Sequence, residues 1–218
     1  MAITLVAALL LQDELRKEWE GFTEGSSVTV RITESDGEKQ ESVVQRYQIA
    51  KNEAESVLVR LEQGGRSKEQ SIATKKDAAF KKLGTESVDV DGRTFTCTVW
   101  EKVTEAGKTR RTVKQWIHKD VPGRVAKIEM VTKADVGELR ASGKVTKLDQ
   151  RLQVNGKGVT YAVYEFAGRT DDGREATAVR WVSEQVPGFT VREETRTTRE
   201  GSTKQVSRVT ELLDFELK

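Results

Sequence analysis

A repeated pattern in the second half of the chain most constrains the fold. The stretch VDGRTFTCTVWE at 90–101 aligns with VNGKGVTYAVYE at 154–165, and WIHKDVPG at 116–123 aligns with WVSEQVPG at 181–188. Both prolines of the chain lie in the second pair of segments. Self-similarity of this kind indicates that one supersecondary unit is used more than once. We therefore read two copies of one unit, over about 85–131 and 149–195.

The second feature is a two-residue alternation of apolar and polar side chains. In 28–33, 94–99, 159–164 and 213–217, every second residue is apolar. Such alternation predicts strands with one buried and one solvated face, which is typical of antiparallel sheets. The Asx-Gly pairs between these runs favour hairpin turns. The predicted fold class is mainly β, with one or more antiparallel sheets, an internal duplication and a short N-terminal helix.

Each repeat is expected to end its third strand with a tryptophan and then turn at Val-Pro-Gly. Proline presets φ for the second position of a tight turn, and the following glycine accepts the positive φ that a type II turn requires. We interpret these positions as structural corners in which the tryptophan covers the apolar side of the turn. The alternative interpretation is that the corners contact a ligand. The corner residues are Trp116, Pro122, Gly123, Trp181, Pro187 and Gly188.

The beginning of the chain suggests export. Residues 1–11 contain an apolar run that matches the central region of a secretory signal. No Lys or Arg precedes this run, and no small-residue cleavage site follows it, so the alternative is a short buried helix. In residues 12–22, Leu15, Trp19 and Phe22 form a narrow apolar stripe that predicts a helix laying Trp19 against a sheet.

These features divide the chain into four segments. Residues 1–11 are read as a signal remnant, 12–84 as the helix plus a degenerate β unit, 85–148 as the first repeat with a connector, and 149–218 as the second repeat with the C-terminal strands. Two stretches lack a strand pattern. KKDAAFKKLG, which ends at Gly84, is expected to form a short helix or turn, and 134–148 is expected to be a connector.

Composition removes several classes of function. Lys and Arg total 37 against 35 Asp and Glu, and this balance argues against a nucleic-acid binder that relies on a basic field. Because the chain has one Cys and one His, it cannot form an intramolecular disulfide or a zinc site built from several Cys and His ligands. The apolar run at 2–11 is too short to span a bilayer. We therefore expect no cofactor, no metal, no nucleic acid and no transmembrane span.

Candidates for catalysis are few. A nucleophilic site could use only Cys97 with His118, but alternation places Cys97 inside a strand and His118 near an exposed turn. Among the carboxylates, Glu101 and Glu165 stand out because both end matching strands. Solvated strand ends with basic cross-strand partners are the simpler interpretation. We predict that the protein is not an enzyme, with a carboxylate hydrolase as the remaining enzymatic alternative.

The corner motifs resemble those of a known family. The order Trp116-Ile117, Pro122, Lys127-x-Glu129 and its counterpart Trp181-Val182, Pro187, Arg192-x-Glu194 is similar to a phrase of the outer-membrane lipoprotein carrier (Lol-type) superfamily and related uncharacterised envelope proteins. The resemblance covers about a quarter of the chain. This chain departs from the family in having the corner twice and in the glycine after each proline. The resemblance implies an incomplete barrel with a helix lid over an apolar concave face that binds acyl chains.

Two non-catalytic functions follow. The first is an exported protein, periplasmic or extracellular, that binds a lipid or other apolar ligand on a curved sheet; a cytoplasmic location is the alternative. The second is a structural or protein-interaction module of the envelope, for which Trp100 and Tyr164 are candidate contacts unless they lie under the N-terminal helix. No particular protein partner is indicated. The predicted ligand contacts are Val28, Val30, Phe95, Val99, Val163, Leu213 and Phe215.

Overall fold

The computed structural model describes residues 17–53, 56–73, 80–135, 137–199 and 205–218. The apolar run at 1–11 and the first part of the predicted helix lie outside these residues. The described chain is almost entirely strand. Its elements are α2 (Lys17–Glu20), β1 (Ser27–Ser35), β2 (Gln40–Asn52), β3 (Ser56–Gln63), β4 (Arg66–Ala73), β5 (Lys81–Val90), β6 (Arg93–Ala106), β7 (Thr109–Ile117), β8 (Val125–Ala134), β9 (Gly137–Val154), β10 (Lys157–Thr170), β11 (Arg174–Val182), β12 (Thr190–Arg199) and β13 (Gln205–Glu216).

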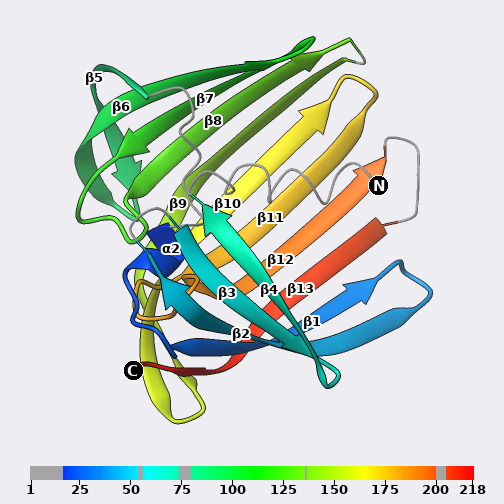
Figure 1. The fold of residues 1–218 in the computed structure, drawn as a ribbon. Coiled ribbons are helices and arrows are strands. Elements are labelled where there is room, and N and C mark those ends of the chain that lie inside the picture. The colour runs from blue at the N-terminus through cyan, green and yellow to red at the C-terminus, as the bar shows by residue number, and fades with distance from the viewer. Residues whose placement is uncertain (1–16, 54–55, 74–79, 136, 200–204) are drawn as a thin grey trace.

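The strands form one antiparallel sheet in the order β4-β3-β2-β1-β13-β12-β11-β10-β9-β8-β7-β6-β5. Sequential strands pair as hairpins, and the pairing of β1 with β13 joins the first and last strands in the interior of the sheet. As a result, β4 and β5 are the two edges (Figure 1). The predicted antiparallel, mainly β fold is confirmed.

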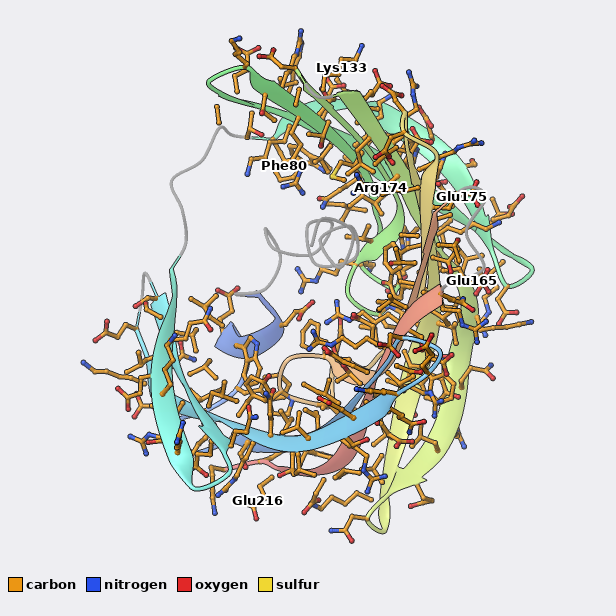
Figure 2. All side chains as sticks on the ribbon, turned by 90° about the vertical axis from the view of Figure 1, so that its right-hand side faces the viewer. Phe80, Lys133, Glu165, Arg174, Glu175 and Glu216 are labelled. Carbon is orange, nitrogen blue, oxygen red and sulfur yellow. The ribbon has the colours of Figure 1, made fainter. Side chains whose placement is uncertain are left out.

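The sheet is strongly curved and does not close. Figure 2 shows it in profile as an arc, with α2 on the inner side of the curve. Glu165 of β10 and Glu175 of β11 lie on the outer, convex side in this view. The fold is therefore a half-barrel with a concave face on which a ligand or another element can rest.

The turns have the expected chemistry. Asn155 and Gly156 both have positive φ, 47° and 76°, as a two-residue type I′ hairpin turn requires. At the first corner, the Arg124 N–H donates to the Val121 carbonyl over 2.7 Å, and Gly123 has φ of 70°. The second corner repeats this contact: the Phe189 N–H donates to the Val186 carbonyl over 2.8 Å. Both corners are thus type II turns of the predicted kind.

Two sequence expectations are wrong. The helix or turn expected at 75–84 is contradicted at its end, because 81–84 belong to strand β5, where a register shift lies between Lys82 and Gly84. Its first part, 75–79, lies outside the described residues. The expected connector at 134–148 lies mostly in β9, which runs for 18 residues across the predicted boundary at 148/149. Pairing with a neighbouring strand overrides local propensity in both places, because strand formation depends chiefly on cross-strand and face packing. The alternation in β9 is hidden because its buried face carries small residues such as Ala141 and Gly143.

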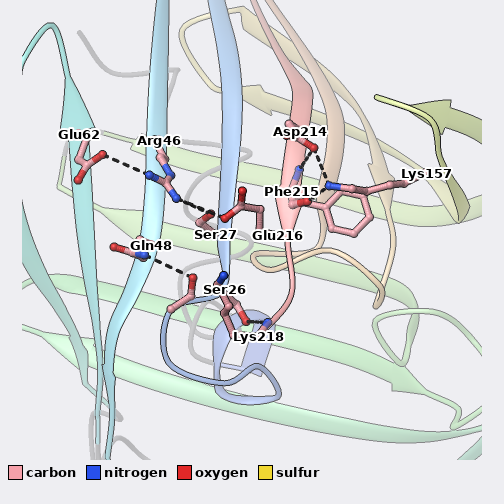
Figure 3. A network of polar contacts seen from close by, with 11 residues as sticks. Ser26, Ser27, Arg46, Gln48, Glu62, Lys157, Asp214, Phe215, Glu216 and Lys218 are labelled. Atoms are coloured by element: carbon pink, nitrogen blue, oxygen red, sulfur yellow. Dashed lines mark hydrogen bonds and ion pairs between the residues drawn. The ribbon is translucent and has the colours of Figure 1, made fainter.

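The C-terminal strand is held by polar contacts on both sides (Figure 3). The Arg46 guanidinium on β2 lies 3.9 Å from the Glu62 carboxylate on β3 and 3.6 Å from Glu216 on β13. On the other side, the Lys157 ammonium lies 2.8 Å from the Asp214 carboxylate. The hydrogen bond from Lys157 holds the pKa of Asp214 below its usual value. These contacts join β13 to β2 on one side and to the start of β10 on the other, so they support the centre of the sheet.

Candidate ligand-binding pocket

The concave face contains a pocket of about 400 Å³ between α2, the two corners and strands β7–β11. Its lining combines aromatic and aliphatic side chains with a few polar ones. This size and composition are typical of small-molecule sites in proteins. The lining residues are Glu18, Glu20, Gly21, Phe22, Gln115, Gly123, Arg124, Val125, Lys127, Ile128, Gly143, Tyr164, Phe166, Arg180, Val182, Glu184 and Phe189.

The floor of the pocket is a row of residues paired across four strands. Gln115 pairs with Ile128, Ile128 with Gly143, and Gly143 with Phe166. A Cβ on Gly143 would lie 2.2 Å from the Phe166 ring, so only glycine lets this ring lie flat on β9. Gly143 thus positions the Phe166 ring in the floor of the pocket, because any side chain on β9 at this point would collide with the ring.

A buried ion pair closes one end of the pocket. The Arg180 guanidinium on β11 donates to both carboxylate oxygens of Glu18 on α2, each over 3.0 Å. The side chains are only 5% and 7% exposed. Burial by itself lowers the pKa of Arg180, but the charges of Glu18 and Glu193 outweigh burial and raise that pKa. The raised pKa keeps the Arg180 guanidinium charged, and the pair fixes α2 to the sheet.

The roof of the pocket is held by aromatic packing on the second corner. Trp19 of α2 is 8% exposed and lies so close to Gly188 that a Cβ there would be 2.7 Å from the indole ring. The Gly188 N–H donates to the Glu18 carbonyl over 2.8 Å. Phe22 meets Phe189 edge to face, with 6.2 Å between ring centroids. The tryptophan that covers this corner is therefore Trp19, whereas Trp181 stacks on Tyr161 instead.

The first corner forms a side wall and is anchored in the second repeat. The Tyr164 hydroxyl donates to the Pro122 carbonyl, and the Gly123 N–H donates to the Glu184 carboxylate over 3.0 Å. Burial raises the pKa of Tyr164, so the hydroxyl remains a donor throughout the physiological range. Tyr164 is buried and lines the pocket together with Glu18 of α2. Since the first part of the predicted helix lies outside the described residues, a place under that helix stays a prediction for Trp100 and Tyr164.

The seven predicted ligand contacts lie elsewhere on the sheet. Val28, Val30 and Phe215 are buried in one hydrophobic cluster together with Trp19. Phe95 and Val99 belong to the other cluster, which also includes Tyr164 and Phe166. Val163 and Leu213 are half-buried. None of the seven is among the residues lining this pocket, and ligand contact at these positions stays a prediction.

The other candidate groups have structural surroundings. Cys97 is fully buried, and burial raises the pKa of its thiol, which keeps it from the reactive thiolate form. His118 packs its ring against Phe95 with 5.0 Å between centroids. Glu101 pairs across the strands with Lys81 and Lys114, and Glu165 accepts from the Thr146 hydroxyl over 3.1 Å.

No group of three or more His, Cys, Asp and Glu side chains in the described parts of the chain is arranged to hold a metal ion. In the same residues, no helix is both long and apolar enough to cross a membrane.

Sequence reasoning missed most of the pocket lining. Three polar residues of the lining lie in predicted strands or in the predicted helix, where a polar side chain is expected to face solvent. They are Gln115, Arg180 and Glu18. One signal was present: Arg180 has the same parity as Ala178 and Val182, both of which are buried. A charged residue within such a row indicates a buried ion pair, and its partner could not be named from the sequence.

Comparisons with known proteins find similarity in fold only. No protein-family model matches the chain, and no curated protein matches it in sequence. A LolA superfamily protein from Nitrosomonas europaea is 10% identical, with 95% of this chain and 93% of that chain covered and a TM-score of 0.38. A domain from Vibrio parahaemolyticus described as an outer membrane lipoprotein-sorting protein is 11% identical, with 96% and 92% covered and a TM-score of 0.40.

Proposed function

We propose that the protein is a non-catalytic binding protein that holds an apolar or amphipathic molecule in the pocket beneath α2. The observation that carries this proposal is the pocket itself. Its volume of about 400 Å³ lies within the range of ligand sites, and Phe22, Phe166 and Phe189 contribute aromatic surface to it. Apolar surface that is left open to water on a concave face is stabilised when an apolar ligand covers it.

The chemistry of the lining supports binding over catalysis. The buried charges of Arg180 and Glu18 satisfy each other, and the Tyr164 hydroxyl donates to a backbone carbonyl. These groups hold the walls in place and are not poised to exchange protons with a substrate.

The proposal includes export from the cytoplasm, which the apolar run at 2–11 supports. Fractionation of cells that express the protein from its own gene tests this part. Recovery of the protein in the periplasm or the medium is expected. Recovery in the cytoplasm alone would contradict it.

The binding proposal is tested by mass spectrometry on an organic extract of the natively purified protein. A stoichiometric apolar molecule is expected. The matched variants are Val125→Trp, which places a large side chain into the pocket wall, and Val44→Trp, at a position on β2 that is 49% exposed. Val125→Trp should lose the molecule and Val44→Trp should retain it, with both variants folded by circular dichroism.

A clean extract from wild type that stays clean after incubation with membrane lipids would contradict binding. It would leave a structural or protein-interaction role in the envelope as the working function. Equal retention by both tryptophan variants would show that any molecule found is held elsewhere.

A further inference from the structure

The pocket contains one buried polar side chain that the fold does not use. Gln115 of β7 is 3% exposed and lines the pocket. Its two β7 neighbours, Lys114 and Trp116, are not part of the lining. No side-chain hydrogen bond joins Gln115 to another described residue. Its carboxamide is not among the fully enclosed polar atoms that lack a partner, so it borders the open space of the pocket. A polar group at the edge of a binding site is paired either by water or by a polar group of the ligand.

The position of Gln115 directs its amide toward a ligand. It stands in the floor row with Ile128, Gly143 and Phe166, all of which line the pocket. Its neighbours in this row are apolar or lack a side chain. A ligand group that donates to or accepts from the carboxamide would satisfy it, whereas bare hydrocarbon would leave it unpaired.

The charges around the pocket select against an ionised ligand group at this place. The cation of Arg180 is already bonded to both oxygens of Glu18. The Lys127 ammonium lies 2.7 Å from the Glu129 carboxylate and 4.3 Å from the centre of the Trp116 ring. Arg124 is exposed, where an ion pair contributes little. The lining also includes the carboxylates of Glu18, Glu20 and Glu184, so its cations and anions are equal in number.

We propose that Gln115 is the specificity-determining residue of the pocket and that it selects ligands with an uncharged hydrogen-bonding group, such as a hydroxyl, ester or amide, on an apolar body. This inference rests on the proposed function. It adds the chemical class of the ligand: neutral and polar at one point, in preference to a pure hydrocarbon, a carboxylate or a quaternary ammonium.

The test compares ligands of one chain length by displacement of the fluorescent probe N-phenyl-1-naphthylamine from the full chain. The ligands are 1-dodecanol, 1-chlorododecane, dodecanoate and dodecyltrimethylammonium. Wild type should bind dodecanol about two- to tenfold more tightly than chlorododecane, which is the worth of one neutral hydrogen bond. It should bind both charged ligands more weakly than dodecanol, because the buried charge of Arg180 is already paired and an ion pair with the exposed Arg124 would not offset the lost hydration of a charged group.

Substitution of the amide isolates its role. Gln115→Leu should lose the preference for dodecanol over chlorododecane while binding chlorododecane at least as tightly as wild type. Gln115→Met, which keeps the unbranched shape, should behave in the same way if Leu perturbs the fold. An unchanged preference in both variants would overturn the inference. So would tighter binding of dodecanoate than of dodecanol by wild type.

The two proposals fail in different ways. If no ligand displaces the probe, or if Val125→Trp leaves displacement intact, the pocket is not the binding site and the proposed function fails. If Val125→Trp abolishes binding but all four ligands bind alike in wild type, the binding function stands and only the role of Gln115 is overturned.

Discussion

At the scale of single residues, a few side chains hold the pocket in shape. Arg180 and Glu18 form a bidentate pair with almost no exposed surface. Arg180 also donates from Nε to the Thr190 hydroxyl over 3.0 Å. Buried pairs of this kind contribute little net stability compared with apolar residues, but breaking one side is costly because the other charge is stranded. The value of this pair is therefore positional: it fixes where α2 rests on the sheet.

This arrangement predicts an asymmetric mutational pattern. Glu18→Gln should lower the free energy of unfolding by about 3–5 kcal/mol, because the buried Arg180 charge loses its bidentate partner and keeps only the Glu193 carboxylate, 3.5 Å from its Nε. The double variant Glu18→Leu with Arg180→Met should recover most of that loss. Urea unfolding of the variants measures both effects. A loss below about 1 kcal/mol for Glu18→Gln would show that water or another carboxylate replaces Glu18.

Gly188 predicts a second residue-level effect. Its φ of 75° and its contact with Trp19 both exclude a side chain. Gly156 is a matched control, because its φ is 76° and a Cβ there would meet nothing within 4 Å. Gly156→Ala should cost about 1–2 kcal/mol from backbone strain alone. Gly188→Ala should cost about 1–3 kcal/mol more, from overpacking against the indole. If urea unfolding gives the same loss of unfolding free energy for Gly188→Ala and Gly156→Ala, Trp19 moves aside without cost.

At the scale of elements, the hairpins are tied to distant strands through their turns. The carboxylate of Asp91, in the β5–β6 turn, accepts from the Leu148 N–H of β9 over 3.0 Å. This hydrogen bond, together with the charge of Lys147, holds the pKa of Asp91 below its ordinary value. The ionised carboxylate of Asp91 thus joins the β5–β6 hairpin, at one edge of the sheet, to the long strand β9.

The lowered pKa gives a pH-dependent prediction. A carboxyl group whose pKa is lower in the folded state stabilises the fold above its unfolded pKa of about 4, and this stabilisation is lost as the pH falls through the folded pKa. Wild type should therefore exceed Asp91→Asn in unfolding free energy at neutral pH, and the gap should narrow below about pH 4. Urea unfolding at several pH values measures this gap. A difference in unfolding free energy between wild type and Asp91→Asn that stays the same at every pH would contradict a stabilising role of the ionised Asp91 carboxylate.

At the scale of the whole molecule, the first and last strands along the chain, β1 and β13, pair in the interior of the sheet. Ser27 of β1 pairs with Glu216 of β13, and this contact joins the β1–β4 hairpins to the remaining strands. The edges are then β4 and β5, one at each end of the open arc (Figure 1). A long edge strand is open to pairing with other chains unless charge or curvature prevents it. The side chains of Arg66, Lys68 and Glu69 on β4 supply such charge.

This topology predicts a gradient of local stability. Backbone amides of β4 should exchange with deuterium fastest among the strands, because one side of β4 is unpaired and its side chains are mostly exposed. Amides of β1 and β13 should exchange most slowly, since both strands are paired on each side. Hydrogen–deuterium exchange with mass spectrometry measures the gradient. Exchange in β13 as fast as in β4 would mean that the pairing of β1 with β13 opens without unfolding of the rest of the sheet.

The sequence by itself determined the local features of this protein. Alternation predicted the strands, Asx-Gly pairs predicted the type I′ turn at Asn155, and Val-Pro-Gly predicted the two type II corners. These features depend on backbone preferences and on the side-chain period of a strand, both of which act over a few residues. The strand β9 was missed because the small residues Ala141 and Gly143 weaken the apolar period of its buried face, which continues to Val145.

Only the tertiary structure decided where the pocket lies and what lines it. The contact of Phe166 with Gly143 depends on the register of β9 and β10, which shifts twice between Tyr161 and Tyr164. Glu18 and Arg180 are 162 residues apart, and their meeting follows from how α2 docks on the curved sheet. A one-residue change of register exchanges the two faces of a strand, so local sequence cannot fix which side chains meet across strands. That choice belongs to the packing of the whole sheet.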